Sequence, residues 1–146
     1  MFSDPIRSVM EPKKLLLASP ESSVHAAAVQ MSDSKVGAIL VVDKGRLVGI
    51  FTERDAVFRV IAAKRDPLTT PLSQVMTTEP KTVGPNESFG HALQLMREHG
   101  FRHAPVIEDG RPIGIVSARG VLDPDLEEFA SEAYRRKSIR REAGYS

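Results

Sequence analysis

One short segment places a hydroxyl, a guanidinium and two carboxylates within four residues: Gly49-Ile50-Phe51-Thr52-Glu53-Arg54-Asp55. Its apolar residues are typical of the end of a buried strand, and Thr52 stands where a following helix needs an N-cap. Two interpretations stay open at this point. Thr52 and Asp55 fit a capping box, which needs no ligand, and the same cap could also hold one.

A degraded second copy of this segment lies sixty-five positions later, at Gly114-Ile115-Val116-Ser117-Ala118-Arg119-Gly120. The same shift aligns many residues upstream, including Pro20 with Pro85, Ser23 with Ser88, Ala27 with Ala92, Met31 with Met96 and Val41 with Val106. The sequence therefore contains a tandem duplication, and two copies suggest a pseudo-symmetric pair.

The order of signals in each copy predicts a strand, a helix, two further strands and a last helix. The first strand is expected at 15–18 and at 81–83. The next helix has apolar residues at helical spacing, which are Val24, Ala27, Ala28 and Met31 in one copy and Phe89, Ala92, Leu93 and Met96 in the other. Hairpins are expected at 38–51 and 104–116, with turns at Gly45 and Gly110. The helix that Thr52 opens is expected to end near Arg65, with one apolar side made of Ala56, Val57, Val60 and Ile61.

We therefore expect an α/β fold in which two β-α-β-β-α repeats pack sheet to sheet as one module, because a sheet of so few strands leaves its faces exposed. The first repeat with its N-terminal lead-in is expected at 1–66 and the second repeat at 67–122. A C-terminal amphipathic helix is expected at 123–146, with Asp123 as its cap.

The composition excludes several classes of function. A net charge of +1 over 146 residues gives no global field that would favour nucleic acid, a membrane or an acidic substrate.

The absence of cysteine removes disulfides, thiol nucleophiles and cysteine metal sites. His99 and His103 are four residues apart, but Gly100 is expected to end the helix between them, and His25 and His91 have no partner acid at ligand spacing, so we expect no metal site. No nucleophile stands with a base, so we expect no enzyme. Neither a leader segment nor a membrane-spanning run is visible, which leaves a soluble, cytoplasmic chain as the expectation.

These features resemble a tandem pair of cystathionine β-synthase (CBS) domains, the arrangement called a Bateman module. The resemblance rests on the duplication, on the segment that ends at Asp55, and on Arg102-His103-Ala104-Pro105-Val106, which is similar to the second strand of that family. It covers roughly residues 6–122. The resemblance implies two repeats that meet sheet to sheet, clefts that often bind adenosine-containing ligands, disc-shaped homodimers and regulatory roles without catalysis.

The resemblance also implies a role for each residue of the candidate site. Asp55 matches the acid that accepts hydrogen bonds from the two ribose hydroxyls. Thr52 matches the hydroxyl at the helix start, where free N–H groups favour a phosphate, and Arg54 could add charge there. Arg102 and His103 match a basic pair that reaches ligand phosphates from the partner repeat, with an exposed strand start or an ion pair as the alternative.

The walls around the adenine base are expected, by the same resemblance, in segments 15–18 and 36–39. The full set of expected ligand-binding residues is Leu17, Ala18, Gly37, Ala38, Thr52, Arg54, Asp55, Arg102, His103, Ser117 and Arg119. Gly120 stands where the second copy should carry the ribose acid, so we expect one good site per chain, built on Asp55.

The leading hypothesis is a stand-alone sensor of an adenine nucleotide (AMP, ADP or ATP) that needs no cofactor, forms a homodimer and acts on a separate regulated protein. The alternative is a structural dimerisation or scaffold module whose nucleotide site has decayed. The arginines near the C-terminus could touch nucleic acid, but no aromatic stacking platform accompanies them, which favours a solvated helix end that also packs on a partner subunit.

Overall fold

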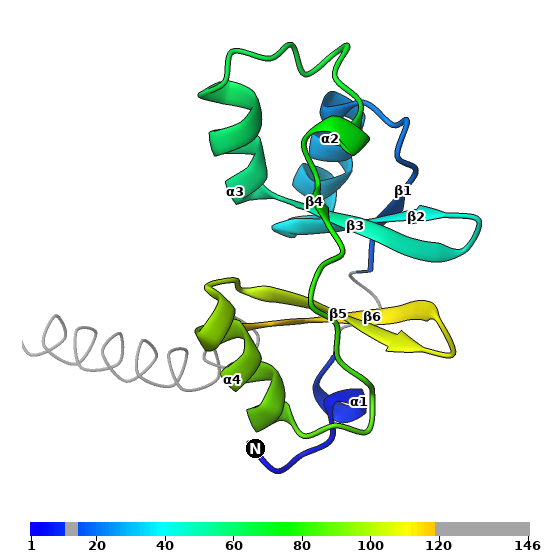
Figure 1. Ribbon diagram of the computed structural model, residues 1–146, viewed down its shortest axis with the longest axis vertical. Coiled ribbons are helices and arrows are strands. Elements are labelled where there is room, and N and C mark those ends of the chain that lie inside the picture. The colour runs from blue at the N-terminus through cyan, green and yellow to red at the C-terminus, as the bar shows by residue number, and fades with distance from the viewer. Residues whose placement is uncertain (11–14, 119–146) are drawn as a thin grey trace, which may run out of the picture.

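The computed structural model describes residues 1–10 and 15–118, and Figure 1 shows two small sheets stacked face to face, each with its helices on the outer side. The sheet of the first repeat has the order β1-β2-β3-β4. Its strands are β1 (Leu17–Ala18), β2 (Ala38–Asp43), β3 (Arg46–Thr52) and β4 (Thr77–Thr78). The helices α2 (Val24–Ser34) and α3 (Glu53–Asp55) cover its outer face.

The sheet of the second repeat consists of β5 (His103–Glu108) and β6 (Arg111–Ser117), with α4 (Phe89–His99) and α1 (Ile6–Val9) on its outer face. The strand expected at 81–83 is wrong. Only Val83 pairs, in a single parallel bridge to Val106, because Gly84-Pro85 follows directly and ends the pairing.

The two long helices begin and end where their sequences indicate. Ser23 and Ser88 are the N-caps, and their Oγ atoms accept hydrogen bonds from the backbone N–H groups three residues on, at 3.1 and 3.2 Å. Lys35 ends α2 and Gly100 ends α4, both in the left-handed conformation. The buried residues of the two helices are Val24, Ala27 and Met31, and Phe89, Ala92 and Met96.

Ala28 and the helix after Thr52 differ from the expectation. Ala28 is exposed and lines a hollow toward α3, so it does not belong to the buried face of α2. The helix after Thr52 consists of α3 and a π-helical segment, η2 (Ala56–Ile61). Its broad apolar stripe is divided, because only one edge of it, formed by Ala56 and Val60, faces the core. Val60 is 2% exposed, whereas Val57 and Ile61 are 49% and 72% exposed.

Both hairpins turn in the same way. The turn residues Lys44-Gly45 have φ angles of 53° and 78°, and Asp109-Gly110 have 53° and 79°. Positive φ at both positions is what a two-residue type I′ turn requires, and it matches the right-handed twist of the strands. Each hairpin also has a register shift at the same place, between Val41/Val42 and between Val106/Ile107. The duplication is therefore preserved down to single backbone irregularities.

Each repeat has its own hydrophobic core, and a third apolar cluster joins the two sheets. The buried residues of that cluster are Ala38, Leu40 and Ile50, with Leu15, Leu47 and Ile115 packed against them. Contact between β3 and β6 places this cluster between the repeats. The expected sheet-to-sheet packing of an α/β pair is thus confirmed.

The segment that precedes each repeat packs on the other repeat. In the N-terminal segment, the Ile6 N–H donates to the Glu87 carbonyl at 2.8 Å. In the linker, the N–H of Leu72, at the start of η3 (Leu72–Gln74), donates to the Ser22 carbonyl at 2.8 Å. Hydrogen bonds therefore cross the expected boundary between residues 66 and 67 in both directions. The segment before the first repeat binds the second repeat, and the segment before the second repeat binds the first.

The C-terminal helix expected from Asp123 onward lies outside the described residues. Within the described part, no helix combines the length and the apolar content that crossing a bilayer would need.

Candidate functional site

Thr52 and Asp55 meet at the junction of β3 and α3 in the expected capping box. Thr52 is in an extended conformation, and its Oγ1 accepts a hydrogen bond from the Asp55 N–H at 3.2 Å. In return, Asp55 Oδ2 accepts hydrogen bonds from the Thr52 N–H at 3.0 Å and from the Thr52 hydroxyl at 3.2 Å. One carboxylate oxygen of Asp55 is therefore committed to the start of its own helix.

The second carboxylate oxygen of Asp55 has only long contacts. The Thr77 hydroxyl lies 3.4 Å from Oδ1, and Arg59 Nε lies 3.5 Å from it. Arg59 also donates from Nη1 to the Met76 carbonyl at 2.9 Å. Both groups near Oδ1 thus belong to the linker strand β4 or are bound to it, and both contacts are longer than a strong hydrogen bond to a carboxylate.

The open ends of the two hairpins lie against each other beside this junction. Ala38 pairs with Thr52 at the end of the first hairpin, and His103 pairs with Ser117 at the end of the second. A Cβ atom built on Gly37 would lie 3.5 Å from His103 Cε1. The structure therefore brings together Gly37, Ala38, Thr52, Asp55, His103 and Ser117.

Glu53 lies in the same place, although the sequence singled out no role for it in binding. A Cβ atom on Gly37 would lie 2.8 Å from Glu53 Oε1, so the glycine lets this carboxylate lie directly against the backbone. The pKa of His103 is lowered, chiefly by burial of the imidazole. The Glu53 carboxylate raises that pKa and the Arg102 guanidinium lowers it, both less strongly than burial acts.

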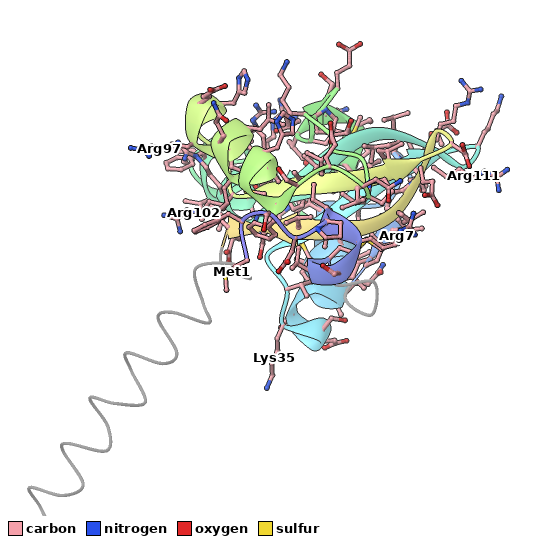
Figure 2. The ribbon with its side chains drawn as sticks, turned by 90° about the horizontal axis from the view of Figure 1, so that it is seen from below. Met1, Arg7, Lys35, Arg97, Arg102 and Arg111 are labelled. Carbon is pink, nitrogen blue, oxygen red and sulfur yellow. The ribbon has the colours of Figure 1, made fainter. Side chains whose placement is uncertain are left out.

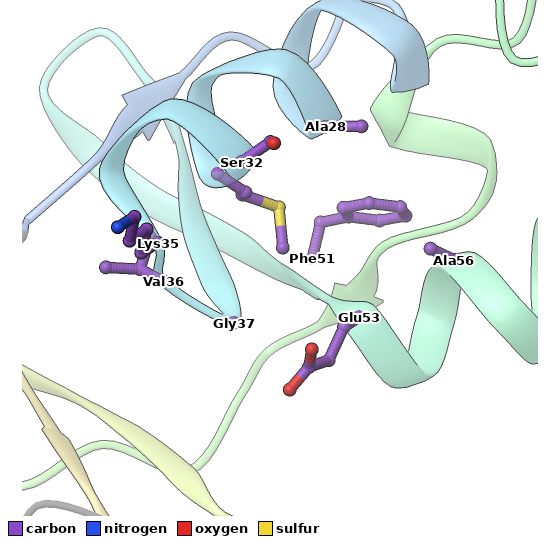
Figure 3. Close-up of a pocket in the computed structure, with 9 residues that line it drawn as sticks. Ala28, Ser32, Lys35, Val36, Gly37, Phe51, Glu53 and Ala56 are labelled. Atoms are coloured by element: carbon purple, nitrogen blue, oxygen red, sulfur yellow. The ribbon is translucent and has the colours of Figure 1, made fainter.

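A hollow of about 340 Å³ opens on the Glu53 side of α3 (Figure 3). Its lining residues come from the end of α2, the loop after it and the β3–α3 junction: Ala28, Met31, Ser32, Lys35, Val36, Gly37, Phe51, Glu53 and Ala56. Neither Thr52 nor Asp55 lines it. The hollow is therefore a neighbour of the capping box and meets the expected site at Val36 and Gly37 of the expected adenine wall.

Four of the expected site residues lie away from Asp55. Leu17 and Ala18 lie on β1, at the opposite edge of the sheet from β4, and Leu17 is 44% exposed. The Arg54 guanidinium lies over the Phe58 ring, 5.3 Å from its centroid, on an exposed side of the helix. Arg102 is exposed beside the start of β5, and its carbonyl accepts a hydrogen bond from the Ala118 N–H at 2.8 Å. Arg119 lies outside the described residues.

Sequence reasoning missed the residues of the linker that reach Asp55, above all Thr77. A signal was present, because the pattern Pro-x-x-x-Val-Met occurs at Pro5–Met10 and again at Pro71–Met76. The two methionines occupy equivalent places: Met76 Sδ lies 2.5 Å from a Cβ built on Gly49, and Met10 Sδ lies 2.8 Å from one built on Gly114. Gly49 in the first repeat therefore packs against Met76 of the segment that precedes the second repeat. Gly114 in the second repeat packs against Met10 of the segment that precedes the first.

No group of three metal-binding side chains occurs within residues 1–10 and 15–118. His99 stacks on Phe101 with ring centroids 6.2 Å apart, and His91 lies near Glu87 on the surface.

Comparison with known proteins places both repeats in one family. The profile of the CBS domain matches residues 6–62 and 72–126. The CBS domain-containing protein YhcV of Bacillus subtilis (strain 168) is 41% identical over 99 residues, which are 68% of this chain and 70% of that protein. A structure of an uncharacterized conserved protein from Pyrococcus horikoshii superposes with a TM-score of 0.77 at 33% identity, covering 86% of this chain and 94% of that one.

The CBS domain protein PAE2072 from Pyrobaculum aerophilum, solved in complex with AMP, shares the fold. It superposes with a TM-score of 0.73 at 22% identity, covering 80% of this chain and 89% of that one.

Proposed function

This chain belongs to the CBS domain family, and from that premise we propose that it is a non-catalytic regulatory module whose Thr52 and Asp55 bind an adenosine-containing ligand such as AMP, ADP or ATP. The observation that carries the proposal is the unequal use of the two Asp55 oxygens. Oδ2 is held by the cap, while Oδ1 has only contacts of 3.4 and 3.5 Å. Two ribose hydroxyls could replace these long contacts without opening the capping box.

The same geometry suggests how ligand binding would be transmitted. Thr77 and Arg59 are the groups that a ribose would displace, and both are joined to β4, which links the repeats. A ligand shifts the arrangement of the repeats only if it binds one arrangement more tightly than the other. Release of the linker from Asp55 supplies such a difference, and a separate regulated protein would respond to it.

We expect one such site per chain. The second repeat has Ser117 at the position of Thr52, and Gly120 stands at the position of Asp55. A glycine cannot accept hydrogen bonds from a ribose through a side chain, so calorimetry should give one ligand per chain. A stoichiometry of two would contradict this assignment.

The decisive test is a thermal melt with adenosine, AMP, ADP and ATP, followed by calorimetry with each compound. A ligand at a hundred times its dissociation constant should stabilise the fold by about 2.7 kcal/mol. Asp55→Asn should weaken binding at least about a hundredfold, because an amide presents one acceptor where the carboxylate presents two. The matched control is Asp43→Asn at the exposed end of β2, which should bind as the wild type does. Wild-type protein that responds to none of the compounds would refute the proposal.

A scaffold role is the second candidate, and one observation favours it. Both Asp55 oxygens already face donors of the protein, and the side chain is 9% exposed. In that case Asp55→Ala should lower the free energy of unfolding by about 1 kcal/mol, the value of a helix cap, and have no other effect. Loss of a nucleotide-induced shift in the same variant would exclude the scaffold role.

The expected homodimer has a candidate surface on η2. Val57, Phe58 and Ile61 are 49%, 62% and 72% exposed and form an apolar patch on one short helical segment. Such a patch on each of two copies can close a symmetric dimer. Sedimentation should show a dimer for the wild type and for Leu17→Glu, and a monomer for Ile61→Glu. A wild-type monomer would contradict the assembly. The cytoplasmic location stays a prediction from the sequence.

A further inference from the structure

The two repeats differ in charge at the point where their hairpins meet. Arg102 in the second repeat corresponds to Gly37 in the first, and Ala118 corresponds to Glu53. The first repeat thus has an acid next to a glycine, where the second has an arginine next to an alanine. The Glu53 carboxylate uses the space that a side chain on Gly37 would fill, as the 2.8 Å distance from a Cβ built there shows. Figure 3 shows Glu53 next to Gly37 at the edge of the hollow.

The described cations near Asp55 leave the Glu53 carboxylate without an ion-pair partner. Arg54 is directed onto Phe58, and Arg59 is bound to Asp55 and to the Met76 carbonyl. His103 is half-buried, and the desolvation of its imidazole lowers its pKa, so the ring is mainly neutral at pH 7. Lys35 shares the hollow with Glu53 but makes no ion pair with it.

Arg102 is the remaining cation at this meeting point among the described residues. It is exposed and makes no ion pair with another described residue, and Figure 2 shows it on the outside of the molecule. Glu53, in contrast, lies next to Gly37 at the meeting point of the hairpins (Figure 3). The first turn of α3 therefore presents the Glu53 carboxylate to a bound ligand without a described cation paired to it.

We propose that Glu53 is a specificity-determining residue of the Asp55 site, which selects adenosine ligands with a neutral or cationic 5′ substituent over ADP and ATP. The inference rests on the proposed function and specifies the ligand class. Glu53 lies against Gly37, and its carboxylate acts on the imidazole of His103. His103 belongs to the pair expected to reach the phosphates of a ligand on Asp55, so the 5′ group of that ligand comes close to Glu53. A thioether or sulfonium is compatible with that carboxylate, and each added phosphate is repelled by it.

The test is calorimetry at constant ionic strength with 5′-methylthioadenosine, AMP and ATP. We expect wild-type affinity to fall in that order, with ATP on the order of tenfold or more weaker than 5′-methylthioadenosine, as expected for a like charge close to the added phosphates. Glu53→Gln should strengthen ATP binding on the order of tenfold and leave 5′-methylthioadenosine unchanged. The matched control is Glu21→Gln, on the exposed loop before α2, which should keep the wild-type order.

Each outcome decides between the two proposals. If no compound binds the wild type, the proposed function fails and the role of Glu53 fails with it. If the compounds bind but ATP is as tight as 5′-methylthioadenosine, or if Glu53→Gln changes all three affinities equally, only the role of Glu53 is refuted. Repeating the titrations at high salt provides a second readout, because screening should reduce the preference in the wild type and not in Glu53→Gln.

Discussion

The open end of the first hairpin, where Ala38 pairs with Thr52, differs in its side chains from the open end of the second, where His103 pairs with Ser117. The two backbones nevertheless share the same turn conformation and the same register shift. Positions that pack the sheets together must be preserved in both copies, because each repeat covers the face of the other. Positions that face the meeting point of the hairpins carry no such constraint, so one copy can keep the acid Asp55 while the other has Gly120 at that position.

The largest expected difference between the two repeats is the loss of stability when Gly49 or Gly114 is replaced by alanine. A Cβ on Gly49 would meet Met76 Sδ at 2.5 Å and the Thr77 carbonyl oxygen at 3.0 Å, whereas the three atoms nearest to one on Gly114 all belong to the Met10 side chain. The Thr77 backbone can move away from an added Cβ less easily than the flexible side chain of Met10 can. Gly49→Ala should therefore lower the free energy of unfolding by about 2 kcal/mol, and Gly114→Ala by about 1 kcal/mol or less. Chemical denaturation measures both.

A Met76→Ala change provides the control for that difference. Combined with Gly49→Ala, it removes the sulfur contact and leaves the contact to the Thr77 carbonyl. Part of the loss from Gly49→Ala should then persist in the double mutant relative to Met76→Ala alone. Equal losses for the two glycine variants would show that the lead-ins are held in the same way.

The helix caps should give a smaller effect, equal in the two repeats. Ser23 and Ser88 each accept a hydrogen bond from a first-turn N–H and each bridges to the proline that begins the other repeat's lead-in. Ser23→Ala and Ser88→Ala should each cost about 1 kcal/mol of unfolding free energy, with Ser34→Ala at the end of α2 as a control near zero. A clear difference between the two caps would show that the repeats contribute unequally to stability.

The smallest expected effect is a pH dependence confined to the second hairpin. Burial lowers the pKa of His103 below its usual 6.5, so the folded protein binds fewer protons than the unfolded chain at that position. His103 therefore contributes stability that is present above pH 6.5 and is lost as the pH falls through the folded-state pKa. Denaturation at about pH 7.5 and about pH 5 should show a smaller decrease for His103→Gln than for the wild type.

The equivalent residue of the first hairpin is Ala38, which cannot titrate. His25→Gln on the exposed face of α2 is the control and should keep the wild-type pH dependence. An identical decrease in His103→Gln and the wild type would place the pH dependence elsewhere.

The sequence alone determined the features that depend on near neighbours. The duplication, the two serine caps, the two hairpin turns and the capping box of Thr52 and Asp55 all follow from residues within a few positions of one another, where backbone geometry and local hydrogen bonds dominate. The spacing of apolar residues was sufficient to indicate two α/β repeats with a shared core, because burial of a periodic face requires one.

Only the tertiary structure decided which distant groups meet. It placed each lead-in on the other repeat, brought Thr77 and Arg59 to Asp55, and left Leu17 at the far edge of the sheet. It also put the Glu53 carboxylate against Gly37. The second repeat has Arg102 at the position of Gly37, and the sequence had indicated no binding role for Glu53. These contacts depend on how two sheets are oriented in space, and no local pattern fixes that orientation.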